Sequence, residues 1–141
     1  MRPAFITNLE SIPEEEHRLD APASAFRLRK RLGKATGAVD LGINQSRLKP
    51  GQVSSRAHSH SREEEFVLIL SGQATLRLGS DSFPLGPGDA ISLRPGGPAH
   101  QLRNDFHEDC LYLEVSTRLN DDIITYPEDG YRRIGDRIEP F

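Results

Sequence analysis

Residues 58–65 read His-Ser-His-Ser-Arg-Glu-Glu-Glu and place three potential metal ligands, His58, His60 and Glu65, within eight positions. Successive side chains of a strand point to opposite faces, so two histidines two positions apart project the same way and can hold one ion. Glu65 stands five positions after His60, an odd offset, so the chain must turn in between. A carboxylate at the head of the apolar run that follows is costly to bury unless a cation neutralises it. This stretch therefore predicts a metal site.

A third imidazole could come from His100, which shares a predicted strand face with Leu102 beyond the proline and glycine corner at 95–98. Three nitrogens and one carboxylate oxygen suit one divalent transition metal ion, namely iron, manganese, nickel, cobalt or zinc, and suit calcium or magnesium poorly. Four protein ligands on an octahedral ion leave two positions open for water or substrate. Glu64 stays an alternative to Glu65 if the turn is one residue tighter. Paired histidines can also form an exposed pH-sensitive patch, but the joint spacing favours metal binding.

Short strand-like segments separated by glycine and proline corners make up most of the chain. Residues 26–32 alternate apolar and basic side chains, the period-two pattern of a strand with one solvated face. Residues 66–70 are apolar on both faces, which predicts a strand covered on both sides. Residues 110–116 form the last clear strand, and no segment after residue 25 shows a sustained helical period. Eight or more short strands of this kind predict an all-β sandwich or small barrel.

The two ends of the chain differ in composition from this central part. Residues 1–25 are polar and interrupted by proline, which predicts an N-terminal arm in which the acidic cluster at 14–16 could open a helical turn. His17, within this arm, is expected to be exposed. The chain becomes polar again from residue 119, so residues 119–141 are expected to form a C-terminal tail that packs on a barrel spanning residues 26–118.

Two segments resemble the two-part signature of the cupin superfamily. They read His58-x-His60-x4-Glu65-x6-Gly72 and Pro95-x-Gly97-x2-His100-x3-Asn104. The resemblance implies a double-stranded β-helix, a jelly-roll barrel whose internal metal is held by His58, His60, Glu65 and His100. Six residues separate Gly51 from His58, and six separate Gly88 from Pro95, where the family usually has five; a β-bulge could absorb the extra residue. Residues 31–38 and 123–127 are also similar to a group of small single-domain bacterial cupins.

Tyr112 and Glu114 lie on one face of the predicted strand 110–116, whose other face is apolar. If the apolar face packs outward, these two side chains look into the barrel as catalytic groups that transfer protons or orient a substrate. The pattern alone is equally compatible with their facing solvent.

Composition narrows the classes of partner. A net charge of −3 gives no long-range attraction for nucleic acid or an anionic membrane. The single cysteine, Cys110, cannot form an internal disulfide, and no apolar run is long enough for a membrane span or a signal peptide, so we expect a cytoplasmic protein. The apolar segment 66–70 and the predicted edge strands favour a homodimer. The expected ligand or substrate is a small molecule.

A cupin fold does not fix one function. Our leading hypothesis is a metalloenzyme acting on a small oxygenated metabolite, by Lewis-acid isomerase, lyase or hydrolytic chemistry or as a dioxygenase. The alternative is a sensor or binding module that holds a carbohydrate or acid ligand without changing it. A barrel with a vestigial metal site is a third possibility, which the complete ligand set disfavours.

Overall fold

The computed structural model describes residues 1–18 and 25–141, whose regular secondary structure is almost entirely β-strand. Residues 19–24 of the expected N-terminal arm lie outside the described residues. The helical elements are η1 (Leu9–Ser11) and the single-turn α1 (Leu32–Thr36). The strands are β1 (Glu15–Arg18), β2 (Phe26–Lys30), β3 (Leu41–Leu48), β4 (Ser59–His60), β5 (Glu65–Ser71), β6 (Ala74–Leu78), β7 (Asp81–Leu85), β8 (Ala90–Leu93), β9 (His100–Arg103), β10 (Cys110–Thr117), β11 (Ile123–Tyr126), β12 (Tyr131–Ile134) and β13 (Arg137–Pro140). In this part of the chain no helix has the length and apolar character needed to cross a bilayer.

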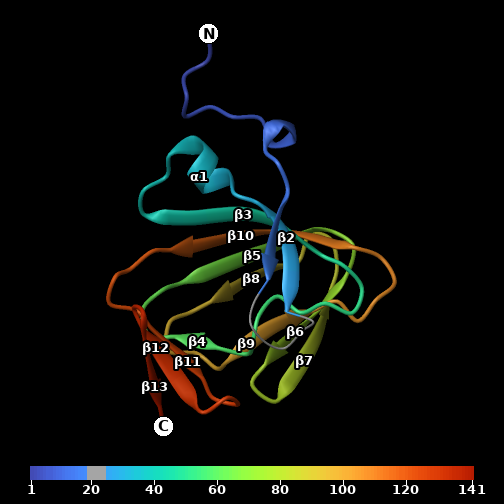
Figure 1. Cartoon of the computed structure of the whole chain (residues 1–141). Coiled ribbons are helices and arrows are strands. Elements are labelled where there is room, and N and C mark those ends of the chain that lie inside the picture. Colours follow the sequence, from blue (N-terminus) through green and yellow to red (C-terminus); the bar gives the residue numbers. More distant parts are fainter. Residues whose placement is uncertain (19–24) are drawn as a thin grey trace.

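Three antiparallel sheets enclose one interior (Figure 1). The largest has the order β1-β2-β3-β10-β5-β8, and the others have the orders β7-β6-β9 and β13-β12-β11-β4. Figure 1 shows β3, β10, β5 and β8 as one layer above β4, β9, β6 and β7. A backbone bridge between His58 and His100 joins the segment before β4 to β9. This arrangement is a double-stranded β-helix and confirms the predicted all-β fold.

The hydrophobic core lies between the sheets and follows the alternation of the strands. Along β5, Val67 and Ile69 are buried, whereas Leu70 on the other face is 43% exposed. The prediction that residues 66–70 are covered on both faces is therefore wrong for the single chain, although the predicted homodimer stays a prediction. The core residues are Leu48, Val67, Ile69, Ala74, Leu76, Leu102, Cys110 and Tyr112.

Both ends of the chain pair with the barrel sheets. The acidic residues at 14–16 do not open a helix, because residues 15–18 form β1 and pair with β2, with His17 opposite Arg27. His17 is half-buried rather than exposed as predicted. At the other end, β11 pairs with β4 so that Ile124 lies opposite His60. The C-terminal residues thus reach the strand that carries a predicted metal ligand.

Gly72 and Asn104, two positions of the cupin-like motifs, have structural roles. Gly72 follows β5 with φ +75°, and a Cβ added there would lie 2.1 Å from the carbonyl oxygen of Asp109. The buried amide of Asn104 donates to the carbonyl oxygens of Leu48 and Glu108, each at 2.8 Å. These contacts hold the loops at one end of the barrel close together.

Candidate metal centre and cavity

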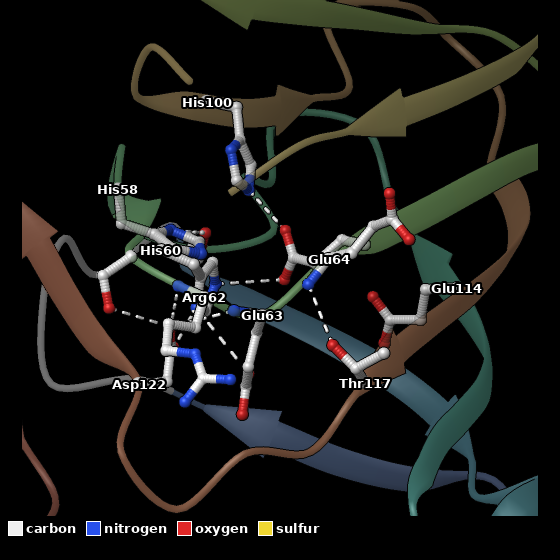
Figure 2. A network of polar contacts seen from close by, with 12 residues as sticks. His58, His60, Arg62, Glu63, Glu64, His100, Glu114, Thr117 and Asp122 are labelled. Atoms are coloured by element: carbon white, nitrogen blue, oxygen red, sulfur yellow. Dashed lines mark hydrogen bonds and ion pairs between the residues drawn. The ribbon is translucent and has the colours of Figure 1, made fainter. Parts of the chain in front are cut away.

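Four of the predicted ligands converge inside the barrel. The potential donor atoms of His58, His60, Glu65 and His100 all lie within 4.8 Å of one another. Oε2 of Glu65 lies 2.6 Å from Nε2 of His100, and Oε1 of the same carboxylate lies 3.2 Å from Nε2 of His60. Figure 2 shows the three imidazoles gathered at one place. Glu65, and not the exposed Glu64, joins this cluster.

Local secondary structure explains why these side chains meet. His60 is the last residue of β4 and His58 directly precedes that strand. Glu65 is the first residue of β5, after the turn that the odd spacing predicts. The backbone N–H of His58 donates to the carbonyl oxygen of His100 at 3.2 Å, and the N–H of His100 donates back at 2.9 Å. This reciprocal pair of backbone hydrogen bonds holds His58 beside His100 independently of a bound ion.

The hydrogen bonds of the imidazoles direct their Nε2 atoms toward the centre. Nδ1 of His58 lies 2.7 Å from the carbonyl oxygen of Arg56, which can only accept, so Nδ1 carries the proton. Nδ1 of His60 lies 2.6 Å from Oδ2 of Asp122 and donates to it. In His58 the Nε2 atom is left with the lone pair that a metal ligand requires, and Nε2 of His60 faces the same centre.

The donor set fits a divalent transition metal. Nε2 of His60 is buried and makes no hydrogen bond of acceptable geometry to any described residue, despite the nearby Glu65 oxygen. Burial, followed by the proximity of His100, lowers the pKa of His58 to about 4, so this ring is neutral at pH 7. Burial alone would raise the pKa of Glu65, but His100 and His60 hold it well below its usual range. Neutral imidazole with an anionic carboxylate matches the ligand chemistry of iron, manganese, nickel, cobalt or zinc.

His60 has a carboxylate on each side. Burial alone would lower its pKa, but Glu65 and Asp122 raise it to about 9. The proton that His60 therefore holds at neutral pH is one that a bound metal would displace.

Asp122 positions His60 and was not predicted from the sequence. It is buried, and its Oδ1 accepts hydrogen bonds from the backbone N–H groups of Arg62 at 2.8 Å and Glu63 at 3.0 Å. Its other oxygen accepts from His60, as Figure 2 shows. The atoms of His60, Glu63 and Asp122 also lie close together, and this group shares His60 with the ligand cluster, so Asp122 supports the cluster through that ring. The sequence around residue 122 is polar and contains no motif that predicts a contact with His60. Its one local feature is that it precedes the apolar pair 123–124.

A cavity of about 360 Å³ opens beside the ligand cluster. Tyr112 and Glu114 both line it, so they face the barrel interior rather than solvent. Glu114 accepts hydrogen bonds from Oγ of Ser46 at 2.9 Å and Nδ2 of Asn44 at 3.3 Å. The Tyr112 hydroxyl is buried without a hydrogen-bond partner among the described residues. Burial and then Glu114 raise the pKa of Tyr112, so its phenol stays a neutral donor.

Arginine side chains dominate the charge of the cavity wall. The arginines that line it are Arg27, Arg29, Arg56, Arg118 and Arg133. The expectation of a solvated basic face on residues 26–32 is therefore wrong, because Arg27 and Arg29 of β2 face the cavity. The alternation predicts two faces of this strand correctly but not which of them is enclosed.

The C-terminal hairpin supplies aromatic residues to the same wall. The ring of Tyr126 in β11 lies 5.8 Å from the ring of His58 and stacks on Tyr131 of β12 at 4.8 Å. Both tyrosines line the cavity. The segment after residue 118 thus shapes the site as well as covering the barrel.

Comparison with known proteins agrees with this architecture. A family model described as "Cupin domain" matches residues 44–116, which is more than half of the chain. The chain belongs to the cupin family. This cupin is 32% identical over 80 residues to the (S)-ureidoglycine aminohydrolase of Arabidopsis thaliana, a match that covers 57% of the chain. The cupin spans about a quarter of the length of that curated relative, since the match covers 26% of it.

Two solved structures resemble nearly the whole chain. One, from Acidithiobacillus ferrooxidans and provisionally named a sugar phosphate isomerase, has a TM-score of 0.91 and 29% identity, covering 98% of this cupin and 92% of that protein. The other, named a sugar phosphate isomerase from Silicibacter pomeroyi, has a TM-score of 0.82 and 28% identity, covering 94% of this cupin and 88% of that protein. The likeness extends over the terminal strands as well as the barrel.

Proposed function

We propose that this cupin is a metal-dependent isomerase of a small, anionic, sugar-like metabolite. The observation that supports it most directly is that the candidate metal ligands share one cavity with Glu114, Tyr112 and several arginines. The names of the two similar solved structures favour the same reaction class. A cavity of about 360 Å³ suits a small metabolite.

The charge of the cavity wall favours an anionic substrate. Five arginines line it, whereas the lining carboxylates are Glu65 and Glu114. Of these two, Glu65 belongs to the ligand cluster and Glu114 is held by neutral donors and Arg27. A concave surface with an excess of one sign of charge concentrates ligands of the opposite sign.

Isomerisation of an aldose to a ketose moves a hydrogen from C2 to C1 and a proton from O2 to O1, so it needs a base near the carbons and a donor near the oxygens. A divalent ion held by His58, His60, Glu65 and His100 would polarise the substrate carbonyl. Glu114 is the lining carboxylate outside the ligand cluster, and we assign it the transfer of the carbon-bound proton. Tyr112, with a buried and unpartnered hydroxyl, is assigned the hydrogen bond to the substrate oxygens.

The test begins with protein purified without added metal or a chelating tag. Elemental analysis gives the metal content, and incubation with a panel of aldose phosphates in D₂O shows by NMR both ketose formation and deuterium uptake at carbon. We expect Glu114→Gln to retain the metal and lose turnover, and His100→Ala to lose both.

Turnover that survives metal removal would refute the proposal. Metal-loaded protein that binds sugar phosphates and returns them unchanged, without deuterium exchange, would instead support the binding module.

A further inference from the structure

Three basic side chains of the first two strands form a group in the cavity wall outside the ligand cluster. Arg27 and Arg29 are two positions apart on β2, so their side chains share a face, and His17 of β1 lies opposite Arg27 in the strand register. All three line the cavity. The Nε atoms of both arginines are buried without a hydrogen-bond partner among the described residues.

Arg29 forms no ion pair within the described part of the chain, although Glu15 lies opposite it in the strand register. Arg27 lies 3.7 Å from Glu114, and Arg31 lies 3.0 Å from Glu15, but Arg29 has neither an ion pair nor a hydrogen bond to any described residue. Burial, then the like charges of Arg27 and Arg31, lower the pKa of Arg29 against the opposing attraction of Glu114 and Glu15. Since an arginine keeps its proton in proteins, this position holds a cation without an ion-pair partner among the described residues.

We infer that Arg29, assisted by Arg27 and His17, forms a subsite for the phosphate group of the substrate. The planar guanidinium presents parallel N–H donors that match two phosphate oxygens. Arg27 is partly engaged, because it donates to the carbonyl oxygen of Ser54 and lies near Glu114, so Arg29 is the principal contact. Burial and then Arg27, Arg29 and Arg31 lower the pKa of His17 to about 4, which leaves a neutral ring with one N–H to donate.

The subsite and the ligand cluster share one cavity. Arg27 and Arg29 line this cavity together with His58, Glu65 and His100. A substrate that carries a phosphate at one end and oxygen atoms at the other would contact both groups within it. The inference rests on the proposed function for the rest of the substrate, but phosphate binding can be measured without turnover.

Calorimetric titration with inorganic phosphate tests the subsite. The His100→Ala variant is used as the background so that phosphate does not bind a metal, and wild-type protein treated with a chelator serves as a second metal-free preparation. In either background, Arg29→Gln is expected to weaken phosphate binding at least tenfold. Arg29→Lys, which keeps the charge and loses the planar fork, is expected to lose affinity in part. Arg137→Gln, on β13 with a side chain that is 66% exposed, is the matched control and is expected to bind as before.

Thermal melting separates a binding role from a structural one. Without phosphate, Arg29→Gln should melt at the same temperature as its parent or higher, because the substitution removes a repulsive charge. Phosphate should raise the melting temperature of the parent but not of Arg29→Gln.

Unchanged phosphate affinity in Arg29→Gln, or equal loss in Arg137→Gln, would overturn the inference. Succinate binding as tightly as phosphate would also overturn it, in favour of a carboxylate subsite. Metal-dependent turnover together with phosphate binding that does not depend on Arg29 would refute the subsite and leave the proposed function intact. Phosphate binding that depends on Arg29, without any turnover, would support the subsite and refute the proposed function.

Discussion

Oδ2 of Asp122 lies 2.6 Å from Nδ1 of His60, although 62 positions separate the two residues in the chain. Burial alone would raise the pKa of Asp122, but the backbone N–H of Glu63, then His60 and the N–H of Arg62, lower it, so the carboxylate stays charged. A histidine that donates to a carboxylate in this way is fixed in orientation and becomes a better metal ligand. The segment between β10 and β11 therefore acts directly on the candidate metal centre.

Asp122→Asn should lower metal affinity by about 10- to 100-fold, because the amide no longer favours the Nδ1–H form of His60 or strengthens it as a ligand. Competition with a chromophoric chelator measures the change. Asp121→Asn is the matched control, since Asp121 is 63% exposed and pairs with Arg62 on the surface. Equal losses in the two variants would contradict the role of Asp122.

Glu65→Gln should abolish the stabilisation of the protein by its metal, whereas Glu64→Gln should leave it intact. Only Glu65 joins the three histidines, and Glu64 is exposed. At a metal concentration of about 100 times Kd, the wild-type protein gains about 2.7 kcal/mol in free energy of unfolding, which a metal titration followed by thermal melting detects. Stabilisation of Glu65→Gln to the same extent would remove Glu65 from the ligand set.

Cys110 should resist alkylation by iodoacetamide at pH 8 in the folded protein and react readily in denaturant. The residue is fully buried, and burial raises the pKa of its thiol to about 11. Roughly one thiol in a thousand is then ionised at pH 8, and the thiolate is the reactive form. The chain has a single cysteine, so mass spectrometry of the labelled protein reports on this site alone. Rapid labelling under native conditions would show that the end of the barrel around β10 opens.

Gly72→Ala should cost more than about 3 kcal/mol in free energy of unfolding, because it combines a left-handed backbone with a severe clash against the carbonyl of Asp109. Gly51→Ala isolates the first of these effects, since Gly51 has φ +83° but nothing lies within 4 Å of an added Cβ. That control should cost about 1–2 kcal/mol. Denaturant unfolding of both variants measures the difference, and equal costs would mean that the loop at Asp109 yields without penalty.

The candidate ligands could be predicted because their spacing carries geometric information. His58 and His60 share a strand face, and the odd offset to Glu65 requires the turn that the structure contains. His100 follows from the second motif. Asp122 could not be found in this way, because its contact with His60 depends on the pairing of β11 with β4, which no local pattern encodes.

Strand alternation separates the two faces of β2 and of β10, but it does not show which face of each strand points into the barrel. The pattern predicts that Arg27 and Arg29 face solvent, as charged side chains usually do, yet both line the cavity. Tyr112 and Glu114 could equally have faced outward on pattern alone, and only the position of β10 between β3 and β5 places them inside. The face that a strand encloses depends on its neighbours in the sheet, and those neighbours are distant in the chain.

The pairing of β11 with β4 makes the C-terminal strands and the candidate metal centre one thermodynamic system. Metal binding at the ligand cluster also stabilises the docking of Asp122 and of β11, which follows it. By reciprocity, docking of β11 strengthens metal binding by the same free energy. Protection of the last residues from proteases should therefore follow metal occupancy, so a simple digest reports on an event inside the barrel.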